Sequence, residues 1–89
     1  MEKLCDKHKK TVEKYDGTIE QLADDISNLH YETLEHFLDR LSGKLFLDSM
    51  NDTKGGRHKL AESLNKASEE IGKARKSVGE ACIISKPYM

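Results

Sequence analysis

Two long stretches of helical periodicity lie on either side of a Gly-Gly pair. Apolar residues recur every three or four positions through residues 18–48 and again through residues 57–84, with Gly55-Gly56 between them. This spacing marks one face of an α-helix, and thirty helical residues are ~45 Å long. Because a Gly-Gly loop lets the chain reverse, the pattern predicts a long antiparallel helical hairpin whose loop spans residues 49–56.

Charge is sorted between the two halves of this hairpin. Residues 18–53 carry eight acidic and two basic side chains, whereas residues 54–89 carry eight basic and four acidic ones. Opposite charges on neighbouring helices favour one orientation, although an exposed pair contributes only ~0–1 kcal/mol. We therefore expect the charges to select how the helices pair more than to stabilise them.

A shorter helix is expected ahead of the hairpin, at residues 2–15, where Leu4, His8, Val12 and Tyr15 have helical spacing. Asp16-Gly17 then indicates a turn. The apolar pattern leaves two arrangements open, a separate N-terminal helix or one continuous with the second helix.

The start of the second helix carries a capping signature, because Thr18 and Gln21 have the spacing of a capping box. We expect an all-α fold that forms one small domain over residues 1–89. The final residues, 85–89, form a tail. The architecture is either a three-helix bundle or a hairpin that dimerises into a larger bundle.

The hairpin predicts a seam in which large residues oppose small ones. Aligning the two segments about the loop places Leu45 opposite Leu60 and Leu41 opposite Leu64. Farther from the loop, the helix predicted at residues 57–84 offers mainly small residues such as Ala67, which allow a close approach of two helices.

Large apolar residues in the helix predicted at residues 18–48 exceed what one seam can cover, and this surplus predicts self-association. A thin core is expected for a chain of 89 residues, and a twofold dimer is the commonest way to cover such a surface. The leading interpretation is a small non-enzymatic protein-interaction or regulatory module, a homodimer or a binder of another protein. The expected interface residues are Leu34, Phe37, Leu38, Leu41, Phe46 and Leu47. Near the C-terminal end, Ile83, Ile84 and Tyr88 either dock on the core or contact a partner.

Composition predicts a cytoplasmic protein without a membrane anchor. The two cysteines, Cys5 and Cys82, form no disulfide framework and no zinc site. The first residues are too polar for a secretory signal, and no apolar run approaches the ~20 residues that a membrane-spanning helix needs. No cofactor is expected under the leading interpretation.

One alternative is a metal-dependent enzyme. Glu32-x-x-Glu35 is followed on the facing helix by Glu62-x-x-Asn65. This spacing resembles that of the all-α nucleotide pyrophosphohydrolases of the MazG kind, whose E-x-x-E and E-x-x-D motifs hold magnesium against a triphosphate. The resemblance implies Glu32, Glu35 and Glu62 as Mg²⁺ ligands. Asn65 stands where that family has an aspartate, which removes an anionic oxygen that a hard cation prefers.

A second alternative is an anion-binding or nucleic-acid-binding module on the basic C-terminal helix. Its candidate residues surround and follow the Gly-Gly pair: Lys54, Arg57, Lys59 and Lys66. Glycines followed by cations at a helix N-terminus can hold an anion through backbone amides. The net charge of the chain is only −1, however, and aromatic platforms are lacking, so nucleic acid is not the expected partner.

Overall fold

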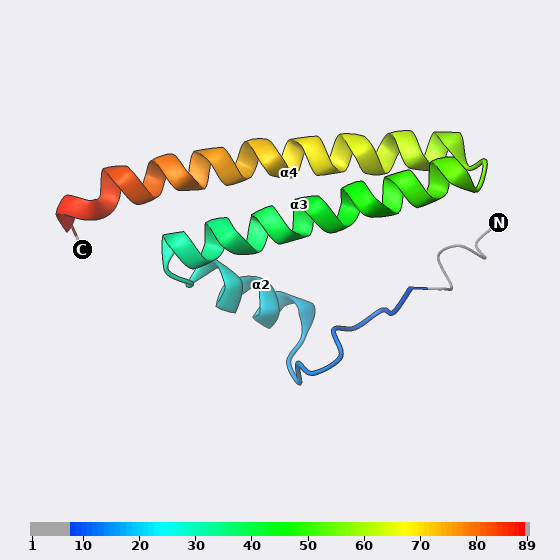
Figure 1. The fold of residues 1–89 in the computed structure, drawn as a ribbon. Coiled ribbons are helices and arrows are strands. Elements are labelled where there is room, and N and C mark those ends of the chain that lie inside the picture. The colour runs from blue at the N-terminus through cyan, green and yellow to red at the C-terminus, as the bar shows by residue number, and fades with distance from the viewer. Residues whose placement is uncertain (1–7, 89) are drawn as a thin grey trace.

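The computed structural model describes residues 8–88, which form a long helical hairpin with a short helix beside it (Figure 1). Helix α2 spans Ile19–Ser27, α3 spans Tyr31–Lys54, and α4 spans His58–Ser85 before a 3₁₀ turn, η1, at Lys86–Tyr88. No strand occurs within residues 8–88. The predicted all-α fold, a long helical hairpin preceded by a shorter helix, is therefore confirmed, although the shorter helix lies at Ile19–Ser27 and not at the predicted residues 2–15.

The bend between α3 and α4 is tighter than predicted. The helices leave only residues 55–57 as the loop, so the expected loop over residues 49–56 is wrong. Gly56 has a φ of 81°, a left-handed conformation that favours glycine, and the N–H of Gly55 donates to the Asn51 carbonyl at 3.0 Å. The polar residues before the glycines, which indicated a loop, instead form the last turns of α3.

The predicted helix over residues 18–48 is divided into α2 and α3. Its start is confirmed, because Thr18 and Gln21 form the reciprocal capping box with bonds of 2.8 and 3.1 Å. The interruption covers residues 28–30, and the Nδ1 atom of His30 accepts from the Glu32 N–H at 3.2 Å, capping α3.

The position of the apolar residues explains why one continuous helix does not form. The apolar stripe of α2 contains Ile19, Leu22 and Ile26. On a single helix it would lie about 100° around the axis from the leucine stripe of α3. The break lets α2 turn back beside α3 instead (Figure 1).

The helix predicted at residues 2–15 is wrong where it can be assessed. Residues 8–15 are not helical, and residues 2–7 lie outside the described part of the chain. Few large apolar residues occur in this segment, and isolated helices of this length are marginal in water. Its end is anchored by Tyr15, whose hydroxyl donates to the Asp25 carboxylate at 2.6 Å.

Small polar residues form the seam between α3 and α4. The Ser42 hydroxyl donates to the Ser68 carbonyl at 2.9 Å, and the Ser68 hydroxyl donates to the Ser42 carbonyl at 2.8 Å. Nearer the bend, the Ser49 hydroxyl donates to the Ala61 carbonyl at 2.8 Å. A hydroxyl can reach the opposite backbone only where two helices approach closely, so these bonds fix both the spacing and the register.

This register corrects the predicted pairing. The predicted alignment puts Ser42 opposite Ser63, whereas Ser42 bonds Ser68. The pairs Leu45–Leu60 and Leu41–Leu64 are therefore not directly opposed across the seam. The error follows from the bend, because α3 continues six residues beyond its predicted end at residue 48, which shifts the centre of the hairpin.

Large side chains are displaced from the seam. Among residues 8–88, the buried apolar residues are only Ala61 and Cys82, the buried polar ones are Ser49 and Ser68, and no large side chain is fully buried. Helices that meet through serine, alanine and glycine leave their leucine, isoleucine and phenylalanine side chains on the two sides of the contact. The hairpin therefore lacks a closed hydrophobic core.

Replacing Ser68 by leucine tests the close seam. We expect Ser68→Leu to lower the free energy of unfolding by about 1–3 kcal/mol, because the larger side chain would force the helices apart and break the paired serine bonds. Urea unfolding followed by circular dichroism measures the change. Ser63→Leu is the matched control, since Ser63 is exposed on the same helix; equal effects of the two substitutions would contradict a tightly packed seam.

The Tyr15–Asp25 contact predicts a shifted titration. The hydrogen bond to Asp25, then desolvation and the negative charges of Asp25 and Asp24, raise the pKa of Tyr15 above its ordinary value. The contact therefore stabilises the fold below the ordinary tyrosine pKa of about 10 and is lost as the pH rises through the folded-state value. Ultraviolet absorbance titration should show one tyrosine shifted upward, with Asp25→Asn lowering its pKa and Tyr15→Phe removing that step. A titration curve that Asp25→Asn leaves unchanged would disprove the contact.

Candidate interaction surface

The seam divides the hairpin into two flanks. One, here called the leucine flank, has a groove lined by Leu41, Leu45, Leu60 and Leu64, and His8 from the N-terminal segment also lines it. The half-buried side chains of α2 are the apolar ones, Leu22 and Ile26. The chain's own N-terminal part therefore covers some of this flank.

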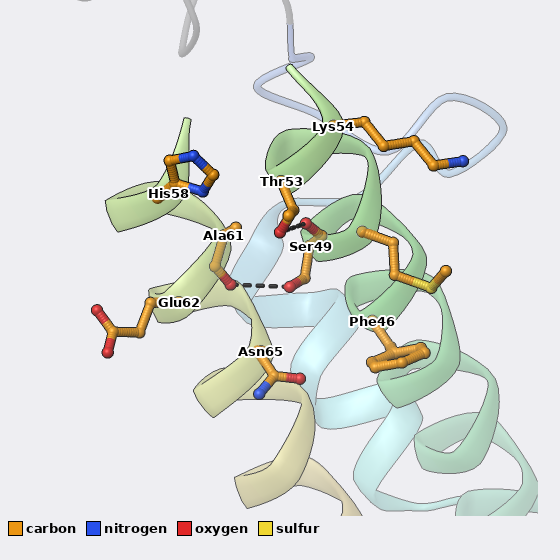
Figure 2. A pocket seen from close by; sticks show the side chains of 9 residues that line it. Phe46, Ser49, Thr53, Lys54, His58, Ala61, Glu62 and Asn65 are labelled. Carbon is orange, nitrogen blue, oxygen red and sulfur yellow. Dashed lines mark hydrogen bonds between the residues drawn. The ribbon is translucent and has the colours of Figure 1, made fainter. Parts of the chain in front are cut away.

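The opposite side of the hairpin, here called the phenylalanine flank, has a groove near the bend (Figure 2). Phe46, Ser49 and Thr53 of α3 form one wall, and Ala61 and Asn65 of α4 form the other. The Ser49–Ala61 bond closes the floor, and the Thr53 hydroxyl donates to the Ser49 carbonyl at 3.1 Å. Figure 2 shows the Phe46 ring at the groove, and α2 passes behind the two long helices.

Charged side chains border this groove without filling it. Lys54 and Glu62 extend away from it on opposite sides, and His58 lies at its upper end (Figure 2). The α3 wall of the groove therefore combines the apolar side chains of Phe46 and Met50 with the hydroxyls of Ser49 and Thr53, and the α4 wall carries an amide, Asn65.

A second groove lies at the open end of the hairpin and on the same flank. Its lining includes Glu32 of α3 with Lys76 and Ile83 of α4. Glu32 and Phe46 are fourteen residues apart, and Glu62 and Lys76 are also fourteen residues apart. Fourteen residues are close to four helical turns, so residues that line the two grooves share a face.

An ion pair crosses the seam within the open-end groove. Arg75 donates to Glu35 at 2.9 Å, and its Nε lies 3.7 Å from the Asp39 carboxylate. Gly79 makes room for Glu35, because a Cβ at that position would lie 3.1 Å from the carboxylate. Arg75 and Glu35 are each about one third exposed, so the pair orients the helices more than it stabilises them.

The six residues predicted as an interface divide between these surfaces. On the leucine-flank side of α3, Leu34 and Leu38 are half-buried, and Phe37 and Leu41 are each 37% exposed. On other faces of the helix, Phe46 is 48% and Leu47 is 57% exposed. The structure thus separates one predicted patch into a partly covered group and a more exposed pair.

Met50 joins this exposed pair and was not predicted. It lines the bend groove and is 43% exposed. Its neighbours Ser49, Asn51 and Asp52 favoured a loop, and a methionine in a loop gives no helical-face signal. At the C-terminal end, Ile83 and Ile84 of α4 are each 68% exposed and Tyr88 of η1 is 85% exposed, so they do not dock on the core.

The structure does not bring the three predicted magnesium ligands together. Glu35 is paired with Arg75, whereas Glu62 borders the bend groove thirteen residues along α4, a separation of about 20 Å at helical rise. Glu32 lines the open-end groove with Glu35. Within residues 8–88, no three His, Cys, Asp or Glu side chains gather as a metal site would require.

The four predicted anion ligands are likewise dispersed. Arg57 donates to Asp52 at 2.8 Å, and Lys54 extends away from the bend groove (Figure 2). Lys59 and Lys66 are exposed on α4, about two turns apart. Glu62 lies between these two lysines in sequence, so the basic residues do not form a continuous patch.

The comparisons with known proteins identify no relative. No protein-family model, no curated protein and no solved structure matches the chain. None of the helices described here is long and apolar enough to span a bilayer. Function must therefore be inferred from the chain's own surfaces.

The separation of the carboxylates predicts no magnesium-dependent hydrolysis of nucleoside triphosphates. Phosphate release or pyrophosphate release should stay at the buffer background, because Glu62 lies too far from Glu35 to share an ion with it. Magnesium-dependent turnover by the unmodified protein that is lost in both Glu35→Gln and Glu62→Gln would overturn this prediction. Glu69→Gln, on the same helix as Glu62, is the matched control.

Proposed function

We propose that this protein is a non-enzymatic interaction module that associates with a second copy of itself through exposed apolar residues of the helical hairpin. The supporting observation is that the chain alone leaves its apolar side chains without a core. Self-association supplies the missing layer, since helices bury their apolar stripes against other helices.

Surface area and dimensions support this proposal. A compact monomer of 10.1 kDa should expose about 5,300 Å² of surface, whereas this chain exposes 7326 Å². The radius of gyration is 15.6 Å, against about 12 Å for a compact domain of this length. The excess, about 2,000 Å² per chain, is within the range that obligate dimers bury.

The distribution of exposed residues favours the more exposed end of α3 as the centre of the contact. Phe46, Leu47 and Met50 are each more than 40% exposed, whereas the leucines of the other flank are partly covered by the chain itself. Phe46 and Met50 line one groove, so they offer a recessed apolar surface that a helix of a second copy could enter. Phe46 is therefore the residue whose removal should be most damaging.

Sedimentation equilibrium over a wide range of protein concentration tests the proposal. Reducing agent must be present, because a disulfide through Cys5 or Cys82 would give a false dimer. We expect the mass of a dimer for the unmodified chain, with Phe46→Glu raising the dissociation constant about 100-fold or more. The reason is that a twofold interface loses two contacts, each worth ~1.5 kcal/mol or more.

Ile84→Glu is the matched control for this substitution. Ile84 is also exposed and apolar, but it lies one residue beyond Ile83, which rotates its side chain about 100° away from the phenylalanine flank. Circular dichroism establishes that both variants remain helical. A chain that stays monomeric at the highest concentration, or a dimer that Phe46→Glu does not weaken, would rule out the proposed contact.

A further inference from the structure

We infer that two copies pair through their phenylalanine flanks about a twofold axis that sets the bend of one hairpin beside the open end of the other. In this arrangement Ile83 of each copy lies at the level of Phe46 of the other. The inference rests on the proposed self-association and adds to it the surface, the orientation and the register.

Two strongly exposed apolar side chains of this flank, Phe46 and Ile83, lie at opposite ends of the hairpin, and Met50 lies in the same groove as Phe46. Phe46 lines the groove at the bend, and Ile83 lines the groove at the open end. Both are strongly exposed, at 48% and 68%. An antiparallel pairing brings each Phe46 to an Ile83 of the second copy, so both exposed residues of both chains are covered at once.

The register of the seam allows these contacts to be placed. Ser42 and Ser68 are level with each other, because they exchange hydrogen bonds. From that level, helical rise puts Phe46 about 6 Å toward the bend and Ile83 about 22 Å toward the open end. A twofold axis that relates these two positions must cross the hairpin midway, about 8 Å from the serine pair on the open-end side.

Two further charges of the flank, one on each side of the Glu35–Arg75 pair, agree with the same axis. Asp39 lies about 4.5 Å and Lys76 about 12 Å from the serine pair toward the open end, and their midpoint is again about 8 Å. The coincidence arises because Asp39 precedes Phe46 by seven residues and Lys76 precedes Ile83 by seven residues. The same twofold rotation therefore sets Phe46 beside Ile83 of the second copy and Asp39 beside Lys76 of the second copy. Because the dimer is symmetric, each of these contacts occurs twice.

The parallel alternative is less favourable on the same surface. Setting bend beside bend would put the two Asp39 carboxylates at one level and the two Lys76 ammonium groups at another. It would also gather Lys54 and His58 of both copies at one end. Like charges at an interface are unfavourable and select against that orientation.

A mixing experiment tests the orientation. Phe46→Glu and Ile83→Lys are prepared as separate proteins, each expected to raise the dissociation constant roughly 100-fold because each disrupts both contacts of its own dimer. When the two are mixed, one contact of the mixed dimer pairs glutamate with lysine and the other keeps the original phenylalanine and isoleucine. We expect the mixture, measured by sedimentation equilibrium in reducing buffer, to recover most of the dimer.

The controls separate failure of this inference from failure of the proposed function. Ile84→Lys, with the same exposure as Ile83, should neither weaken the unmodified dimer nor restore dimers when mixed with Phe46→Glu. A dimer that Leu41→Glu abolishes and Ile83→Lys leaves intact would keep self-association but move it to the leucine flank, which overturns the inference. A mixture that stays monomeric would overturn the antiparallel orientation, and an unmodified chain without any dimer would overturn both proposals.

Discussion

The close contact between α3 and α4 through small residues determines the rest of this structure. Paired serine hydroxyls reach across to opposite backbone carbonyls at Ser42 and Ser68, and Ser49 does the same at Ala61. Each such bond contributes only about 1 kcal/mol, but all of them need the same short distance between the helices. That distance excludes large side chains from the seam and moves them to the flanks.

The consequence is a fold whose secondary structure is complete and whose hydrophobic core is not. Helices α3 and α4 are long, and α2 and α3 are capped at their starts by Thr18 and His30, whereas α4 begins without a side-chain cap. The burial that normally offsets the conformational entropy of folding is missing, since no large side chain among residues 8–88 is fully buried. A second layer of helices would provide it, which links the seam directly to the proposed self-association.

Sequence periodicity was sufficient for the helical hairpin because apolar spacing in the two long segments is strong. The prediction from periodicity failed at the end of α3, where loop-type residues gave a local signal that competed with the helical pattern. Ser49, Asn51 and Asp52 are typical loop residues, yet they lie in the last turns of α3, because Ser49 has a tertiary partner that sequence alone does not show. The register error followed from this one misplaced boundary. The N-terminal helix failed at residues 8–15 for the opposite reason, since a correct spacing had too few large apolar residues to stabilise it.

The apolar surplus on α3 was also visible in the sequence, but its division between two flanks was not. A helix has one set of neighbours per face, and only the observed register shows that Leu38 and Phe46 lie on opposite sides of the seam. For the carboxylates the spacing was misleading in the same way. Glu35 and Glu62 lie on facing helices, but Glu35 is level with Arg75 and far from Glu62.

The dependence of stability on protein concentration tests most directly whether this chain needs a second copy to complete its core. The midpoint of thermal unfolding, followed by circular dichroism in reducing buffer, should rise steadily as the protein concentration is increased, because association stabilises only the folded state. A midpoint that is high and independent of concentration would show that the hairpin is stable alone, and would contradict the account.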